Sequence, residues 1–363
     1  MQRRPLTTAL LLTLAGAAVA CSSSGSDSDT TASTGIARGT TAAIEVTTPT
    51  ETVPDSVSGP APTEPVSTDP VVSEPTNTEP VATEPTGTEP TGTEPGVEFE
   101  LLTYNVAGLP AALSGSEPDV NTALIGERIN DYDVVLVQES WLTFDEPDAP
   151  ASTYHQILLD ASEHLFTSES LAQPRGTDPD RPTAQLSDGL NRFSNFEIGD
   201  VERIRWNQCG DASADCLSLK GFSVSTVDIG GAEVDLYNLH LDAGREDFAV
   251  RADNVAQLIA HIEAEASGRA VIVGGDFNLR LERDPDGDQF ADLLASAGLT
   301  DVCSELDCPE PGRIDKVLYR SSEDIEITAL EWRNDSEIFT RDDGAPLSDH
   351  DPVVVTFEVA TTD

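Results

Sequence analysis

Short apolar segments rich in β-branched residues recur along residues 97–363, separated by turn or charged residues. Segments of this kind predict buried β-strands. We expect strands at 99–104, 134–137, 221–227, 234–239, 270–273, 316–319, 325–332 and 353–359. Apolar residues at helical spacing predict helices at 120–130, 245–266 and 288–297. Because several strands follow one another directly, the pattern favours an α/β domain of packed sheets with helices outside, rather than a doubly wound sheet.

The first 21 residues have the polarity pattern of an export signal. Arg3 and Arg4 precede an apolar stretch that runs from residue 6 to residue 20, a length typical of secretory signals. The sequence Ala-Val-Ala precedes Cys21, which resembles a bacterial lipoprotein processing site, so we expect Cys21 to be lipidated. An ordinary cleaved signal with an incidental cysteine is the alternative. No apolar run reaches the roughly 18 residues that a membrane-spanning helix needs.

Residues 22–96 are dominated by Ser, Thr, Pro, Glu and Gly, and their second half repeats T-E-P loosely. Such a segment buries too little apolar surface to offset its ordering entropy, so we expect a disordered tether. At about 3.1 Å per residue where it is polyproline-like, it could extend on the order of 200 Å. We therefore expect an exported protein, anchored to a membrane by lipid, with its domain held away from that membrane. A linker that merely tolerates variation is the alternative.

Acidic residues outnumber basic ones by 66 to 20, for a formal net charge of -46. Residues 97–363 alone contain 54 Asp and Glu against 17 Lys and Arg. This composition excludes the basic surface typical of a nucleic-acid coat protein. A phosphate-bearing substrate must instead meet a metal ion or a local basic pocket.

Four cysteines remain when Cys21 is assigned to lipid: Cys209, Cys216, Cys303 and Cys308. An even number in an exported chain predicts disulfides. Local pairs, Cys209 with Cys216 and Cys303 with Cys308, are the simplest of three connectivities. A zinc site is the rival interpretation, but the cysteines form no C-x-x-C motif and have no nearby histidine.

Polar residues gather where the expected strands begin or end. They are Asn105, Glu139, His240, Asp242, Asp276, Asn278, Asp315, Asp349 and His350. Any one of them alone would be an ordinary cap or structural residue, but the set together indicates a catalytic site. Its oxygen-rich composition suits a hard cation such as Mg²⁺ rather than zinc. Two histidines can serve as base and acid near neutral pH.

The order of these residues resembles the endonuclease/exonuclease/phosphatase superfamily. This superfamily includes pancreatic-type deoxyribonucleases, apurinic endonucleases, inositol-phosphate phosphatases and neutral sphingomyelinases. G-D-F-N at 275–278 followed by S-D-H at 348–350 is specific in combination, and the resemblance runs from residue 102 to about residue 357. It implies a four-layer sandwich, in which two mixed β-sheets pack face to face with helices outside and the site lies at one end.

The resemblance also implies a metal site. Glu139 would bind Mg²⁺, with Asn105 and Asp349 in or near its coordination shell. Mn²⁺ or Ca²⁺ could replace Mg²⁺ there.

Catalytic roles are implied for five further residues. Asp276 would orient or deprotonate the attacking water, and Asn278 would hold a phosphate oxygen. His240 and His350 would flank the phosphate and relay protons, and Asp315 would orient one of these histidines. Phosphoryl transfer depends mostly on positioning and charge neutralisation, so these groups suffice without a covalent nucleophile.

One segment departs from the family pattern. At residues 189–196 the family usually has G-L-x-x-x-S-R, whereas here Asn195 stands at the arginine position. We expect Arg192, which lies just upstream, to supply the missing cation to the substrate. A less basic site is the alternative.

The substrate class follows from two further motifs. K-G-F at 220–222 and H-L-D-A-G at 240–244 resemble the sphingomyelinase branch, so we expect Lys220 and Asp242 to contact the substrate. We predict a monomeric phosphodiesterase acting on a phospholipid head group or a small phosphodiester. The alternatives are a secreted metal-dependent endonuclease, for which nucleic acid would be only a substrate, a phosphomonoesterase, and an inactive surface lipoprotein that binds a partner.

Overall fold

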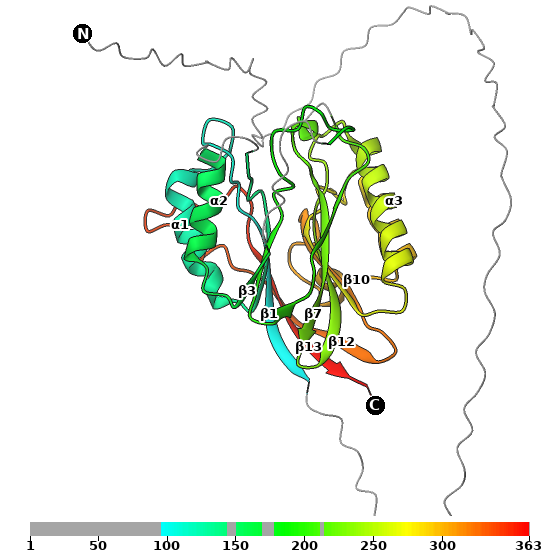
Figure 1. The fold of residues 1–363 in the computed structure, drawn as a ribbon. Coiled ribbons are helices and arrows are strands. Elements are labelled where there is room, and N and C mark those ends of the chain that lie inside the picture. Colours follow the sequence, from blue (N-terminus) through cyan, green and yellow to red (C-terminus); the bar gives the residue numbers. More distant parts are fainter. Residues whose placement is uncertain (1–95, 144–149, 169–177, 211–213, 363) are drawn as a thin grey trace, which may run out of the picture. The chain divides into compact units, whose positions relative to one another are not determined.

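The computed structural model describes residues 96–143, 150–168, 178–210 and 214–362. Two β-sheets lie face to face, with α1 and α2 outside one sheet and α3 outside the other (Figure 1). The helices are α1 (Pro118–Arg128), α2 (Pro150–Ala161), α3 (Phe248–Glu265), α4 (Asp286–Ala297) and α5 (Val302–Glu305), with 3-10 turns η1 (Ile129–Asp131) and η2 (Asp215–Leu217). The expected four-layer fold is therefore confirmed. The signal segment, Cys21 and the tether lie outside the described residues.

The first sheet has the strand order β12-β13-β1-β2-β4-β3. Its strands are β1 (Val97–Asn105), β2 (Val134–Gln138), β3 (Phe166–Thr167), β4 (Asn191–Ser194), β12 (Ile325–Asn334) and β13 (Val353–Thr361). β1 and β2 are parallel, with Asn105 opposite Gln138, and the other pairs in this sheet are antiparallel.

The second sheet has the order β10-β11-β9-β8-β7-β5, and β6 also pairs with β7. Its strands are β5 (Glu197–Ile198), β6 (Glu202–Arg205), β7 (Gly221–Ile229), β8 (Ala232–His240), β9 (Val271–Asp276), β10 (Thr300–Asp301) and β11 (Asp315–Arg320). β8 and β9 run parallel, whereas β9 and β11 run antiparallel. Both sheets are therefore mixed.

The central strands are buried on both faces. In β1, Leu101 packs in the core between the two sheets, and the next residue, Leu102, packs in the core beneath α1 and α2. Full burial of one such side chain stabilises the fold by about 1.5–3 kcal/mol. Two-sided burial explains why these strands read as continuous apolar runs rather than as alternating patterns.

All eight expected strands and all three expected helices are confirmed, with shifted ends. The helices α2 and α5 and the short strands β3 to β6 and β10 were not predicted from the sequence. In α2 the buried positions include the polar residues Ser152 and His155, which obscure its apolar stripe. Strands as short as two residues carry no periodicity at all.

The two local disulfides are also confirmed. Cys209 pairs with Cys216 at a Cα–Cα distance of 5.2 Å, and Cys303 pairs with Cys308 at 4.8 Å. Separately, no helix in the described part of the chain is long and apolar enough to cross a membrane.

Candidate active site

Strand ends bring the candidate catalytic residues together. Asn105, His240 and Asp276 are the last residues of β1, β8 and β9, and Asp315 is the first residue of β11. The parallel register places His240 opposite Asp276, and the antiparallel register places Asp315 opposite the same residue. The sheet topology thus makes Asp276 the centre of the site.

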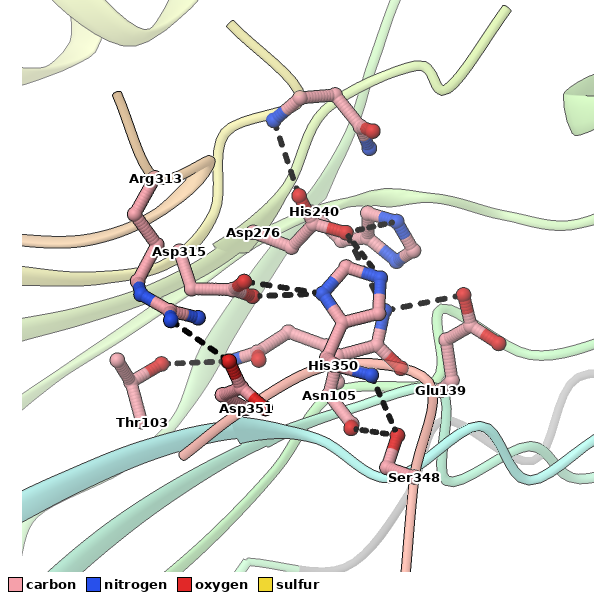
Figure 2. Close-up of polar contacts among 12 residues, drawn as sticks. Thr103, Asn105, Glu139, His240, Asp276, Arg313, Asp315, Ser348, His350 and Asp351 are labelled. Carbon is pink, nitrogen blue, oxygen red and sulfur yellow. Dashed lines mark hydrogen bonds and ion pairs between the residues drawn. The ribbon is translucent and has the colours of Figure 1, made fainter. Parts of the chain in front are cut away.

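Asp276 is buried and accepts contacts from both sheets (Figure 2). Its Oδ2 accepts a hydrogen bond from Asn105 Nδ2 at 3.2 Å and lies 3.2 Å from His240 Nε2. Its Oδ1 accepts a hydrogen bond from the Asn278 backbone N–H at 3.0 Å. Burial opposes ionisation, but the charges of His240 and His350 outweigh it and lower the pKa of Asp276. Asp276 is therefore an ionised hydrogen-bond acceptor at neutral pH.

His350 is held by a carboxylate on one ring nitrogen. Its Nδ1 lies 3.0 Å from both oxygens of Asp315, and its Nε2 lies 3.8 Å from Asp276 Oδ2 (Figure 2). Burial lowers the pKa of His350, but Asp315, Asp276 and Asp349 raise it well above its usual value. The pairing commits Nδ1 to Asp315 and leaves Nε2 directed into the site.

Glu139 follows β2 in a left-handed backbone conformation, with φ of 63°. The Gly108 N–H donates to the Glu139 carbonyl at 3.2 Å, and a Cβ at residue 108 would lie 2.3 Å from that oxygen. A non-glycine residue in this region of φ costs on the order of 1–3 kcal/mol, and such strain clusters at functional sites. The side chain then accepts a hydrogen bond from Asn105 Nδ2 at 3.1 Å, which brings it to the same edge as Asp276.

Three hydrogen bonds that support the site were not predicted from the sequence. Behind Glu139, Ser140 Oγ lies 2.8 Å from His155 Nδ1, and burial lowers the pKa of this histidine to about 4. Ser348 Oγ donates to the Asn105 carbonyl at 2.7 Å and accepts from the His350 N–H at 3.2 Å. The Ser140–His155 and Ser348–Asn105 contacts join residues 15 and 243 positions apart, so no local pattern could have revealed them.

Several groups in the site are suitable for binding a metal ion. Ligand atoms of Asp276, Asp315 and His350 lie within 4.8 Å of one another, but both Asp315 oxygens already contact His350. The Glu139 carboxylate accepts one side-chain hydrogen bond, from Asn105, among the described residues. Asp349 is exposed and lies near enough to Glu139 for their negative charges to interact. This concentration of carboxylates with spare acceptor oxygens fits a hard divalent cation.

Lys220 is buried at the edge of this site. Its Nζ lies 2.6 Å from Asp215 Oδ1, and the other oxygen of that carboxylate accepts the Ala243 N–H at 2.7 Å. Burial alone lowers the pKa of Lys220, but the charges of Asp215, Glu139 and Asp276 leave it raised. Lys220 therefore adds a positive charge close to the site, and its contact with substrate stays a prediction.

Asp242 is a buried residue of the loop after β8. Its Oδ1 accepts the Gly210 N–H at 2.8 Å, so it ties this loop to the disulfide-closed loop that carries Asp215. Burial and the nearby charge of Asp215 raise the pKa of Asp242 to about 7. Asp242 thus holds the two loops together, and its contact with substrate stays a prediction.

This raised pKa predicts a pH-dependent stability. Between the unfolded pKa of about 4 and the folded pKa of about 7, the folded state binds the additional proton. Asp242 therefore lowers the free energy of unfolding as pH rises through that window, by at most about 1.4 kcal/mol per pH unit. Urea unfolding across that window should show a weaker decline for Asp242→Asn, whose Oδ1 can still accept the Gly210 N–H. Parallel curves for the two proteins would contradict the assignment.

The expectation that Arg192 meets the substrate is wrong. Arg192 lies on β4 and is fully buried between the sheets. Its guanidinium donates to the hydroxyl groups of Ser223, at 2.7 Å, and Ser225, and to the Leu236 carbonyl at 3.1 Å. Burial lowers its pKa to about 9, which keeps the group charged at neutral pH. Arg192 therefore links the sheets and does not serve as the missing cation.

Truncation of Arg192 should mainly affect stability. Arg192→Ala removes a buried hydrogen-bond network and leaves a cavity, so we expect the free energy of unfolding to fall by about 3 kcal/mol or more. Urea denaturation followed by tryptophan fluorescence would measure it. The matched change Arg341→Ala removes ion pairs with the exposed Glu117 and Asp343 and should cost far less, because exposed ion pairs contribute little to stability. Equal losses would show that Arg192 is not a structural link.

Comparison with known proteins agrees with this architecture. A sequence profile of Endonuclease/Exonuclease/phosphatase family 2 matches residues 192–307. Sphingomyelinases of Mycobacterium bovis and Mycobacterium tuberculosis are each 36% identical over 284 residues, covering 72% of this chain and 52% of theirs. The chain thus spans about half the length of these relatives.

Solved structures show the same fold. A beta toxin variant from Staphylococcus aureus with bound magnesium ions has a TM-score of 0.52 at 16% identity, covering 71% of this chain and 99% of the toxin. TDP2 of D. rerio, humanized by 14 mutations, has a TM-score of 0.52 at 18% identity, covering 72% of this chain and 98% of TDP2. Together with the profile match and the mycobacterial relatives, the fold and site identify the domain formed by residues 97–363 as a member of the endonuclease/exonuclease/phosphatase superfamily.

Proposed function

We propose that this protein is a Mg²⁺-dependent phosphodiesterase that hydrolyses the head group of a phospholipid such as sphingomyelin. The observation that carries the proposal is the convergence of His240, Asp276, Asp315 and His350 at one edge of the packed sheets, beside Asn105 and Glu139. The chain is 36% identical to mycobacterial relatives that are named sphingomyelinases, and this similarity supports a lipid as the substrate. The scarcity of basic residues argues against a long polyanionic substrate.

The protein groups divide the work of hydrolysis at phosphorus. Asp276 accepts hydrogen bonds and has a lowered pKa, so it orients the attacking water rather than removing its proton. The two histidines, whose Nε2 atoms both lie near Asp276 Oδ2, would take that proton and protonate the departing alkoxide. Asp315 fixes the ring of His350 through Nδ1, so that Nε2 carries the exchanged proton. Asn278, two residues after Asp276, uses one amide hydrogen on the Leu241 carbonyl and would donate the other to a phosphate oxygen.

Glu139, with Asn105 and Asp349, would hold the Mg²⁺. The ion would supply charge neutralisation for the phosphoryl oxygens in the transition state. The surrounding carboxylates already create the negative potential that such an ion requires.

Substrate choice can be tested with the full-length chain. Sphingomyelin vesicles and supercoiled plasmid DNA would be offered side by side, with Mg²⁺ and with EDTA, and Asp276→Asn would serve as the matched inactive variant. We expect release of phosphocholine that requires Mg²⁺ and is lost in the variant, with the plasmid intact. Plasmid nicking that is lost in the variant would identify a nuclease instead.

We also propose that Cys21 carries lipid and that residues 22–96 tether the domain outside the cytoplasm. The support is the sequence of the first 96 residues alone. Metabolic labelling with a fatty acid should mark the wild-type protein and not Cys21→Ser. Equal labelling, or none in either, would contradict the anchor.

A further inference from the structure

A pocket of about 310 Å³ opens between the start of α3 and the loop that leads into α4. Three of its lining residues are arginines, which is unexpected in a chain of net charge -46. The lining residues are Arg245, Phe248, Arg251, Arg283, Asp284, Pro285 and Asp286. None of them belongs to the catalytic cluster around Asp276.

The arginines of the pocket differ in their partners. Arg251 is buried, pairs with Asp286 at 3.0 Å and donates to the Gly244 carbonyl, so it is part of the wall. Arg245 and Arg283 have no side-chain hydrogen bond or ion pair with any described residue. Two guanidinium groups therefore face the pocket with their donors available.

Counted over its lining residues alone, the pocket carries one net positive charge. Asp286 is neutralised by Arg251, which leaves Asp284 as the one lining carboxylate to set against Arg245 and Arg283. Phe248 is the first residue of α3, so the positive end of an 18-residue helix also lies at the pocket. A guanidinium pair beside a helix N-terminus is well suited to bind a phosphate group.

The pocket adjoins the catalytic residues through the chain. Arg245 lies on the loop that follows His240, and Arg283 lies on the loop that follows Asp276 and Asn278. The two loops are joined at their roots, because Leu241 N–H donates to the Asp276 carbonyl at 2.9 Å and Asn278 Nδ2 donates to the Leu241 carbonyl at 3.1 Å. Both arginines therefore lie on loops that begin at the candidate active site.

An exposed aromatic side chain indicates what kind of phosphate the pocket meets. Phe248 lines the pocket and is 42% exposed. An apolar ring beside cations is typical of protein surfaces that contact the lipid interface. At an ionic strength of about 0.15 M the Debye length is about 8 Å, so the acidic remainder of the surface does not prevent such a local contact.

We propose that this pocket binds the phosphate of a phospholipid head group at the bilayer surface, on a lipid adjacent to the one being hydrolysed. Arg245 and Arg283 would donate to the phosphate oxygens, and Phe248 would lie against the interface. This inference rests on the proposed hydrolysis of a lipid. The neighbouring phospholipid would hold the domain at the bilayer surface while that hydrolysis takes place.

Vesicle binding tests the proposal separately from turnover. The full-length chain would carry Cys21→Ser, so that no lipid anchor contributes, and would be sedimented with phosphatidylcholine and phosphatidylglycerol vesicles in EDTA, which prevents hydrolysis. The test variants are the double change Arg245→Gln/Arg283→Gln and the single change Phe248→Ser. The matched control is Arg269→Gln, at the opposite end of β9 from the site. Mg²⁺-dependent turnover of the soluble diester bis(p-nitrophenyl) phosphate would be measured in parallel.

We expect the double variant to bind vesicles about thirtyfold more weakly than the parent. Phe248→Ser should also bind more weakly, and the control should bind like the parent. Turnover of the soluble diester should be unchanged in all of these variants. Unaltered binding by the double variant would overturn the proposal. A parallel loss of soluble turnover would place these arginines in the catalytic step and would also overturn it. Weaker binding of a short DNA duplex with vesicle binding intact would refute the lipid assignment. If the parent hydrolyses neither sphingomyelin nor the soluble diester, the proposed function is wrong. Vesicle binding in EDTA would still show whether the pocket binds lipid.

Discussion

Replacement of His350 by alanine is expected to lower kcat/KM for phosphodiester hydrolysis by about 10²- to 10⁴-fold. The change removes the ring nitrogen that faces Asp276 and leaves the Asp315 carboxylate buried without its imidazole partner. Both a proton-transfer group and a positive charge near the transition state are lost. Steady-state turnover of sphingomyelin and of a soluble diester would measure the effect.

The matched control is His164→Ala. His164 is half-buried at the opposite end of the first sheet, where its Nε2 contacts the Tyr132 carbonyl at 2.8 Å. This variant should keep parental turnover, while circular dichroism should show that both variants are folded. A folded His350→Ala protein with parental activity would show that the cluster around Asp276 is not the catalytic centre.

Replacement of Glu139 by glutamine is expected to raise the Mg²⁺ concentration for half-maximal activity by about 100-fold or more. The amide is nearly isosteric, so it preserves packing but removes a negative charge from the proposed metal site. Residues that only support metal ligands typically cost 10–100-fold in metal affinity, and a direct ligand should cost at least as much. Mg²⁺ titrations of activity would give one readout, and the rise of Tm with Mg²⁺ would give a second that does not depend on turnover.

Glu323→Gln provides the control for charge. Glu323 is exposed in the turn after β11, and β11 begins at the site with Asp315 and runs away from it. Its Mg²⁺ dependence should match that of the parent. An unchanged Mg²⁺ requirement in Glu139→Gln, with activity intact, would move the metal to other carboxylates, of which Asp276 is the first to test.

Most of the candidate catalytic residues were predictable because they obey a local rule. Asn105, His240 and Asp276 each end a buried apolar run, so a polar side chain stands out against its neighbours. Two-sided burial also made the strands themselves easy to recognise. Short disulfide loops were likewise predictable, because closely spaced cysteines are already near each other along the chain.

The place of Arg192 in the fold could not be read from the sequence. Its position near a family motif suggested a substrate contact, yet its guanidinium lies between the sheets with Ser223 and Ser225. Burial of an arginine requires partners from another strand, and those partners are far away in the sequence. A charged residue in a short strand therefore gives no local sign of whether it faces solvent or the core.

The amino-acid order alone was enough to place the strands, the short disulfides and the polar strand ends, because each depends on neighbours along the chain. It was also enough to indicate the superfamily, through two motifs in a fixed order. The pairing of His350 with Asp315, the strained backbone of Glu139 and the unpaired arginines of the α3 pocket required the folded chain. Each of these depends on which segments the sheet registers and loops bring together, and contacts between distant segments leave no periodic signal in the sequence.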